Sequence, residues 1–261
     1  MTAEDDWQLA EEIAREVSIH LLTLRSTGLR QGKLGSELGR IGDEASENLI
    51  RSRLEQFRPE DSILSEEQRS DDSRRLTADR VWIVDPLDGT REFGLGDRDD
   101  WAVHIALWER DRSKNGGRIS VGIVAMPSLG LVFNSASIAT QAFERETGFT
   151  IVVSESRPPG WMSEIACELN AEILPMGSAG AKVMEVVTGR ASAYIHAGGQ
   201  FEWDSAAPVG VALAANLHAS RLNGDELIYN RPDPYLPDLV VCRSDLSGAI
   251  LGALAKLEDI G

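Results

Sequence analysis

Two aspartates three residues apart, Asp85 and Asp88, are the residues of this chain best suited to chemistry. They follow the apolar run 81–84, which predicts a buried strand, so both carboxylates should lie at the end of that strand. Pro86 fixes its own φ for a turn, and Gly89 permits an unusual backbone angle or a close ligand approach. Oxygen ligands without nearby cysteine or histidine favour magnesium, manganese or calcium over zinc. The segment therefore predicts a hard-cation site, although an ordinary tight turn uses the same residue types.

Further acidic residues lie far from this segment in the sequence. The pair Glu66 and Glu67 ends the short apolar run 62–64, and Glu202 and Asp204 open a stretch with a helical pattern. A carboxylate pair at a strand end, a second acid pair and an acid at a helix start would together form a two-metal cage. The spacing excludes an EF-hand loop, which needs acids at alternating positions followed by a distant glutamate.

The elements that would position these acids are predicted from periodicity. Apolar residues recur at helical spacing over 7–26 and 45–57, and Asp43 stands where an N-cap of the second helix belongs. The glycine-rich segment 28–42 between them predicts a mobile loop. Alternation over 101–108 predicts a strand. Further strands are predicted at 119–126 and 131–134, which suggests helices stacked on an antiparallel sheet.

After about residue 150 the pattern changes to alternating short helices and strands, which predicts a smaller α/β half. The predicted elements there are 150–153, 163–170, 181–188, 193–195, 205–216, 239–242 and 246–257, with a proline-rich turn at 233–238. We therefore expect an N-terminal α+β half over residues 1–148 that carries the antiparallel sheet and most metal ligands. The C-terminal α/β half, 149–261, would carry a substrate loop and Asp204.

The charge of the chain bears on its partners. Among 261 residues, 26 Lys and Arg stand against 42 Asp and Glu, a formal net charge of −16. A nucleic-acid polymer is therefore not expected, because its phosphates need a basic groove. A small anionic substrate is compatible, since bound metal ions reverse the local field. No apolar run approaches the ~20 residues of a membrane helix and no signal-peptide pattern is present, so we expect a cytoplasmic protein without a membrane span. Monomer and homodimer are both open.

Three segments resemble the signatures of the inositol monophosphatase superfamily, a group of magnesium-dependent phosphomonoesterases. They are Leu-Ser-Glu-Glu at 64–67, Trp-Ile-Val-Asp-Pro-Leu-Asp-Gly-Thr-Arg-Glu-Phe at 82–93 and Trp-Asp-Ser-Ala-Ala at 203–207. Leu87, the 91–93 tail and Glu202 resemble its CysQ branch, the 3'(2'),5'-bisphosphate nucleotidases. The segments 99–108, 196–200 and 233–238 resemble the actinobacterial CysQ type. The resemblance covers nearly the whole chain and implies a layered αβαβα sandwich, of α+β and α/β character, with the site between its halves.

The resemblance also implies how the acids act. Glu66, Asp85 and the Leu87 carbonyl would hold the metal that activates water. Asp85, Asp88 and Asp204 would hold the metal nearer the leaving group, with Asp85 bridging. The implied cofactor is Mg²⁺, with two or three ions per site, Mn²⁺ as a substitute and Li⁺ as an inhibitor.

Other roles follow from the same resemblance. The amides of Gly89 and Thr90 would donate to phosphate oxygens, and the Thr90 hydroxyl would contact the attacking water. Asp43 matches the acid that partners this threonine, but the family's Thr-x-x-Asp is here Arg-Ile-Gly-Asp at 40–43. The helix-cap role and the catalytic role of Asp43 are therefore both open. The implied substrate-binding residues are Gly89, Thr90, Arg157, Ser178, Gly180, Lys182, His196 and Asp204.

Two of these positions depart from the family. Arg157 stands where the family often has His, and His196 stands where it often has Arg, so the two look like a reciprocal exchange around one ligand. The loop before Lys182 could bind an anion through its amides, although such a loop is usually only a helix cap. His104 lies within a predicted strand and is expected to be structural.

We expect a magnesium-dependent phosphatase that hydrolyses the 3'-phosphate of adenosine 3',5'-bisphosphate (PAP) to AMP and phosphate in sulfate assimilation. Its sulfate-activated form, PAPS, is a second candidate substrate. The nearest alternative is an inositol-monophosphate or fructose-1,6-bisphosphate phosphatase with the same metals and another pocket. A non-catalytic metal- or nucleotide-binding protein is the alternative from another class. The acid set argues against it, because a binder does not need Thr90 beside a bridging Asp85.

Overall fold

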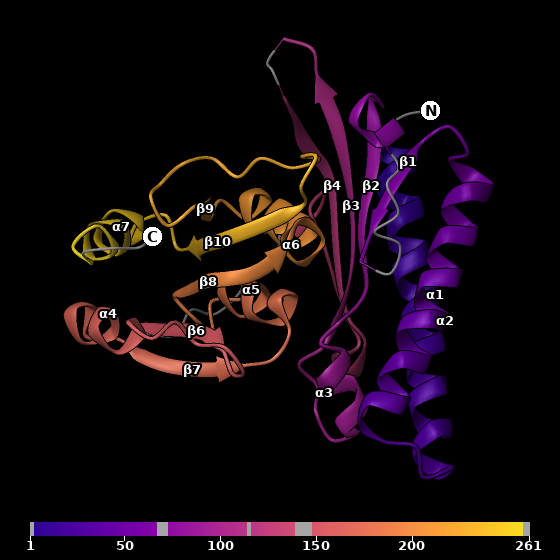
Figure 1. Ribbon diagram of the computed structural model, residues 1–261, viewed down its shortest axis with the longest axis horizontal. Coiled ribbons are helices and arrows are strands. Elements are labelled where there is room, and N and C mark those ends of the chain that lie inside the picture. The colour runs from indigo at the N-terminus through magenta and orange to yellow at the C-terminus, as the bar shows by residue number, and fades with distance from the viewer. Residues whose placement is uncertain (1–2, 67–72, 114–115, 139–147, 258–261) are drawn as a thin grey trace.

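The computed structural model describes residues 3–66, 73–113, 116–138 and 148–257, which form two five-stranded sheets with helices around them (Figure 1). The first sheet has the order β1-β2-β3-β4-β5. Its strands are β1 (Ser62–Ser65), β2 (Arg80–Asp88), β3 (Ala102–Asp111), β4 (Gly116–Met126) and β5 (Leu131–Asn134). β1 is parallel to β2, and the other neighbours are antiparallel, as the alternation of the sequence predicts.

Two long helices, α1 (Ala3–Arg30) and α2 (Gly35–Phe57), cover one face of this sheet (Figure 1). Apolar side chains of α1 such as Ile13 and Val17 are fully buried in one cluster with Trp82 and Ile105 of the sheet. Burial of such side chains contributes about 1.5–3 kcal/mol each, so this face anchors the strand that carries the aspartates.

The loop predicted over 28–42 is wrong, because α1 and α2 leave only four residues between them. The glycines serve close packing instead of mobility. A Cβ on Gly39 would lie 2.7 Å from Thr90 Cγ2, and one on Gly42 would lie 2.7 Å from Leu87 Cδ2. The cap prediction for Asp43 is also wrong, because Asp43 lies inside α2, whose N-cap is Leu34.

The second sheet has the order β7-β6-β8-β10-β9. Its strands are β6 (Thr150–Ser154), β7 (Glu172–Met176), β8 (Ala193–Phe201), β9 (His218–Ser220) and β10 (Tyr235–Cys242). The helices α5 (Ala179–Val187) and α6 (Glu202–Ala214) lie between the two sheets (Figure 1). Their buried side chains share a cluster with residues of both sheets, such as Ile83 and Val152.

The outer face of the second sheet is covered by α4 (Met162–Leu169) and α7 (Ser247–Leu254), which share a third apolar cluster with it. The layers are therefore helix, sheet, helix, sheet and helix, and the predicted αβαβα sandwich is confirmed. The remaining short elements are α3 (Thr90–Leu95) and the 3₁₀ turns η1 (Ser73–Leu76) and η2 (Pro127–Leu129). The division into halves at residue 148 stays a prediction.

Three differences from prediction lie in the second sheet. The sequence analysis does not predict β7 or β9. β7 is an edge strand whose first four residues are exposed, and such a strand does not need the alternation of apolar and polar residues that marks a half-buried strand. The turn predicted at 233–238 is wrong from Tyr235 onward, because those residues begin β10.

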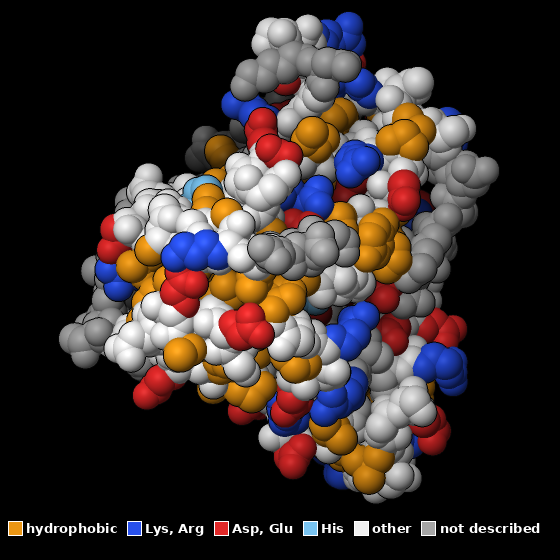
Figure 2. All heavy atoms as spheres, turned by 60° about the vertical axis from the view of Figure 1, so that its left-hand side comes forward, with side chains coloured by type: hydrophobic (Ala, Val, Ile, Leu, Met, Phe, Trp, Pro, Cys, Tyr) orange, Lys and Arg blue, Asp and Glu red, His pale blue; other side chains and the backbone are white. Residues whose placement is uncertain are grey.

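Across the face seen in Figure 2, basic and acidic side chains are intermixed. None of the helices in the described residues has the length and apolarity needed to cross a membrane.

Candidate active site

Three aspartates, Asp85, Asp88 and Asp204, meet between the two sheets. One carboxylate oxygen from each lies within 4.8 Å of the others. Asp85 and Asp88 both lie in β2, and the register with β3 shifts between them, so the local irregularity turns both toward the gap. Asp204 is the third residue of α6 and comes from the opposite side. The structure thus brings together predicted ligands that are more than a hundred residues apart in sequence.

The other two predicted ligands lie beside this cluster. Glu66 directly follows β1, the parallel neighbour of β2, and its negative charge helps to raise the pKa of both Asp85 and Asp204. It is half-buried and does not belong to the tight group of three aspartates. The Leu87 carbonyl accepts a hydrogen bond from Thr90 Oγ1 at 3.1 Å, while its amide donates to Asp85 Oδ1 at 3.1 Å.

The electrostatics of the cluster favour a bound cation. Burial, followed by the charge of Asp88, raises the pKa of Asp85 well above its ordinary value. Burial, followed by Asp88, raises the pKa of Asp204 to about 8. Buried carboxylates that repel one another are costly to ionise, and a divalent cation with oxygen preference removes that cost. The donor set therefore fits magnesium or a similar ion.

Asp88 is held by residues of the second sheet's side. Its Oδ2 accepts hydrogen bonds from Ser178 Oγ at 2.5 Å and from the Gly180 amide at 2.7 Å. Ser178 is also the N-cap of α5, where its Oγ accepts from Ala181 N at 3.0 Å. Of the predicted substrate contacts, Ser178 and Gly180 therefore face Asp88, a predicted metal ligand.

His104, expected to be only structural, lies against the same carboxylate. Its Nε2 is 3.3 Å from Asp88 Oδ2, although the angle is not that of a hydrogen bond, and its Nδ1 is 3.2 Å from the Trp203 carbonyl. Burial lowers the pKa of His104, against the attraction of Asp88. The strand register could have suggested this position, because His104 of β3 pairs with Asp85 of β2.

Thr90 and Asp43 form a hydrogen bond of 2.9 Å between Thr90 Oγ1 and Asp43 Oδ1. Thr90 begins α3 directly after Gly89, whose φ of 88° lies in the left-handed region that favours glycine. The structure therefore brings Asp43 to the predicted threonine even though the family's Thr-x-x-Asp pattern is incomplete here.

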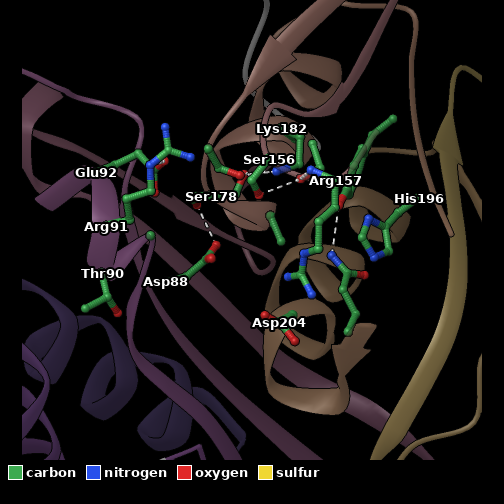
Figure 3. A pocket seen from close by; sticks show the side chains of 16 residues that line it. Asp88, Thr90, Arg91, Glu92, Ser156, Arg157, Ser178, Lys182, His196 and Asp204 are labelled. Atoms are coloured by element: carbon green, nitrogen blue, oxygen red, sulfur yellow. Dashed lines mark hydrogen bonds and ion pairs between the residues drawn. The ribbon is translucent and has the colours of Figure 1, made fainter. Parts of the chain in front are cut away.

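An open pocket adjoins Asp88 and Asp204 (Figure 3). Its volume is about 630 Å³ when the solvent-filled opening is included. Seven of the eight predicted substrate residues line it: Gly89, Thr90, Arg157, Ser178, Lys182, His196 and Asp204. Gly180 is the exception among the described lining, and its amide serves Asp88 instead. Figure 3 shows Arg157 extending toward Asp204, with His196 to its right in this view.

The far wall of the pocket includes two residues that the sequence analysis missed, Tyr194 and Gln200. Gln200 Nε2 donates to Tyr194 Oη at 2.8 Å. Gln200 Oε1 and both ring nitrogens of His196 are buried without a hydrogen-bond partner among the described residues. Burial, followed by the charge of Lys182, lowers the pKa of His196 to about 4, so its ring is neutral near pH 7. Strand alternation from His196 could have indicated both residues.

A layered fold with an aspartate cluster between its two sheets characterises one family of proteins. Comparison of the sequence with models of known families identifies the same family. The chain belongs to the inositol monophosphatase family, which it matches over residues 6–257. Solved structures of this fold include an inositol monophosphatase from Anabaena, with a TM-score of 0.73, 19% identity and 98% of each chain covered. The SuhB protein of Mycobacterium tuberculosis has a TM-score of 0.70 at 22% identity, with 95% of each chain covered. At these identities the likeness concerns the fold alone.

Curated relatives are more similar. A protein named 3'-phosphoadenosine 5'-phosphate phosphatase in Mycobacterium tuberculosis is 51% identical over 222 residues, covering 84% of this chain and 82% of the relative. Its namesake in Mycobacterium leprae is 47% identical over 262 residues, covering 97% and 94%. The 3'(2'),5'-bisphosphate nucleotidase CysQ of Escherichia coli is 30% identical over 206 residues, covering 74% and 80%. The predicted resemblance to the CysQ branch is confirmed.

Proposed function

We propose that this protein is a phosphatase that hydrolyses the 3'-phosphate of PAP to give AMP and phosphate, with PAPS as a second substrate, in the cytoplasm and as part of sulfate assimilation. The observation that supports this most directly is a cluster of three aspartates, Asp85 and Asp88 buried and Asp204 half-buried, that opens into a pocket with an arginine on its wall. The names of relatives 47–51% identical support the choice of substrate.

Magnesium is the proposed cofactor. Asp85, Asp88 and Asp204 would hold it together with Glu66 and the Leu87 carbonyl, and all five groups are oxygen donors of the kind that magnesium prefers. When bound, magnesium neutralises phosphate charge, acidifies a water and stabilises the leaving oxygen.

The chain's own residues would orient the reactants. The single proton of the Thr90 hydroxyl is directed at Asp43 and the Leu87 carbonyl, so the lone pairs of Oγ1 are left to accept a hydrogen bond from the attacking water. Gly89 and Thr90 line the pocket at the start of α3, where backbone amides would donate to phosphate oxygens. Water held in this way would be aimed at phosphorus before the reaction begins.

Arg157 would bind the second phosphate of the substrate. A guanidinium pairs bidentately with phosphate, and its charge does not depend on pH near neutrality. The neutral groups of the far wall, His196, Gln200 and Tyr194, suit the uncharged nucleoside, since their buried polar atoms would gain partners from it. An inositol phosphate or a fructose bisphosphate offers no base to such a wall.

Phosphate release with millimolar Mg²⁺ tests the proposal on four substrates: PAP, 3'-AMP, inositol 1-phosphate and fructose 1,6-bisphosphate. The proposal predicts the highest kcat/KM for PAP. A higher kcat/KM for inositol 1-phosphate or fructose 1,6-bisphosphate would favour the alternative phosphatase with the same metals and another pocket. Absence of release from all four, with magnesium still bound, would favour a non-catalytic binding protein.

A further inference from the structure

Lys182 lines the pocket, but its ammonium group is directed into the protein. It is the fourth residue of α5 and only 2% exposed. Its Nζ donates to the carbonyls of Gly177 and Ser178, the latter at 2.9 Å, and lies 3.5 Å from the Met176 carbonyl. An ammonium has three hydrogens, so these three carbonyls account for all of them.

The segment 176–178 that Lys182 binds is also held from its other side. The Gly177 amide donates to Asp100 Oδ2 at 2.7 Å, and the Ser178 amide donates to the Asp100 carbonyl at 3.2 Å. Arg98 in turn forms an ion pair with Asp100 at 2.5 Å. The segment 176–178 is therefore held between Lys182 and Asp100, which lies in the loop before β3.

The segment 176–178 leads directly into the two donors that hold Asp88, because Ser178 is its last residue and Gly180 follows in the first turn of α5. Ser178 Oγ and the Gly180 amide both converge on Asp88 Oδ2, at 2.5 and 2.7 Å. Because these two donors occupy Oδ2, the lone pairs of Oδ1 are left for a metal ion. A shift of the segment would move both donors at once, and Asp88 would lose its orientation relative to Asp85 and Asp204.

We propose that Lys182 is a positioning residue that keeps the carboxylate of Asp88 in place for the metal by holding the 176–178 carbonyls. This replaces the substrate contact that the family resemblance implies for Lys182. The inference rests on the proposed function, in which Asp88 holds a metal.

The alternative is that Lys182 turns to contact the second phosphate of the substrate. That movement would leave buried carbonyls without partners, at about 1–3 kcal/mol for each group. It would also remove the ammonium from the Tyr194 ring, whose centroid lies 5.2 Å away. Arg157 is a cation of the same pocket that can meet a phosphate without breaking such contacts.

Two measurements on Lys182→Met separate these roles, because methionine fills the same space without a donor. The first is calorimetric titration of the substrate-free protein with Mg²⁺. We expect the variant to bind Mg²⁺ at least tenfold more weakly than the wild type. The second is kcat/KM for PAP and for 3'-AMP, which lacks the second phosphate. We expect equal fold losses on both substrates, reduced when Mg²⁺ is raised.

Arg157→Ala is the matched control, with expected wild-type Mg²⁺ binding and a much larger loss on PAP than on 3'-AMP. Wild-type Mg²⁺ binding by Lys182→Met together with a PAP-selective loss would overturn the inference. Should Lys182→Met not fold, Ser178→Ala decides, since it keeps the lysine and removes one donor to Asp88. Unchanged Mg²⁺ binding by Ser178→Ala would also overturn it. A wild type that binds Mg²⁺ but does not hydrolyse PAP would overturn the proposed function instead, and the calorimetry would still test Lys182.

Discussion

Thr90 and Asp43 are joined by a 2.9 Å hydrogen bond although 47 residues separate them. The contact depends on α2 passing close to the start of α3, which Gly39 allows. Arg40, which replaces the family threonine of this segment, pairs with Glu44 on the solvent side, and both side chains are about 70% exposed. The replacement therefore leaves the Thr90–Asp43 pair intact.

Thr90→Val and Asp43→Ala should lower kcat for PAP by similar factors. Groups that orient or deprotonate an attacking water contribute on the order of 10²–10⁴, and both residues are proposed to act on the same water. The double variant should be little worse than either single variant, because residues that act as a unit are not additive. Kinetics of the three variants measure this, and multiplied losses in the double variant would argue against a shared role.

Stability of the metal-free protein should fall as pH rises from 6.5 to 8. The pKa of Asp204 is raised to about 8 by burial and then by Asp88, so the folded protein keeps a proton that the unfolded chain releases. Such a group stabilises fully below its unfolded pKa of about 4, and this stability is lost as pH rises toward the folded value. The pKa of His196 is lowered to about 4, so its opposite contribution grows mainly between pH 4 and its unfolded pKa of about 6.5 and adds little above pH 6.5.

Thermal unfolding in EDTA at these two pH values measures the effect, with Asp204→Asn as the control. The decrease in Tm should be smaller in that variant, because its amide does not titrate. Added Mg²⁺ should raise Tm again at pH 8. At a Mg²⁺ concentration one hundred times its Kd, binding adds about 2.7 kcal/mol to the free energy of unfolding. A Tm that rises from pH 6.5 to 8 in EDTA would contradict the claim that burial and Asp88 raise the pKa of Asp204.

Lithium should inhibit the enzyme at millimolar or lower concentration. A small, singly charged ion could occupy a site among Asp85, Asp88 and Asp204 and yet stabilise the leaving oxygen poorly. Titration with lithium chloride against sodium chloride at constant ionic strength separates this from a salt effect. Identical curves for the two salts would rule out the lithium site.

Arg157→Ala should lower kcat/KM for PAP far more than for 3'-AMP. A charged contact with phosphate is worth about 1.5–3 kcal/mol, which is tenfold or more. His196→Ala should cost less, because burial keeps this ring neutral near pH 7. Steady-state kinetics on both substrates tests the pair, and equal losses on both by Arg157→Ala would place it outside substrate selection.

The parts of the site that the sequence predicts well are local. Asp85 and Asp88 come after the apolar run 81–84 at the end of β2, and Asp204 stands at a helix start, so short-range patterns identify them. The glycines of α2 misled the prediction because their purpose, close contact with Thr90 and Leu87, lies in another element. The orientations of Lys182 and His104 are likewise set by tertiary contacts that spacing in the sequence does not encode.

The central claim is that the three-aspartate cluster removes the 3'-phosphate of PAP with magnesium. The most direct measurement is the product of PAP turnover, separated chromatographically, for the wild type and for Asp88→Asn. We predict AMP and phosphate from the wild type only when Mg²⁺ is present, and no turnover by Asp88→Asn despite an unchanged fold. Formation of 3'-AMP, turnover in EDTA, or near-wild-type activity of Asp88→Asn would contradict the account.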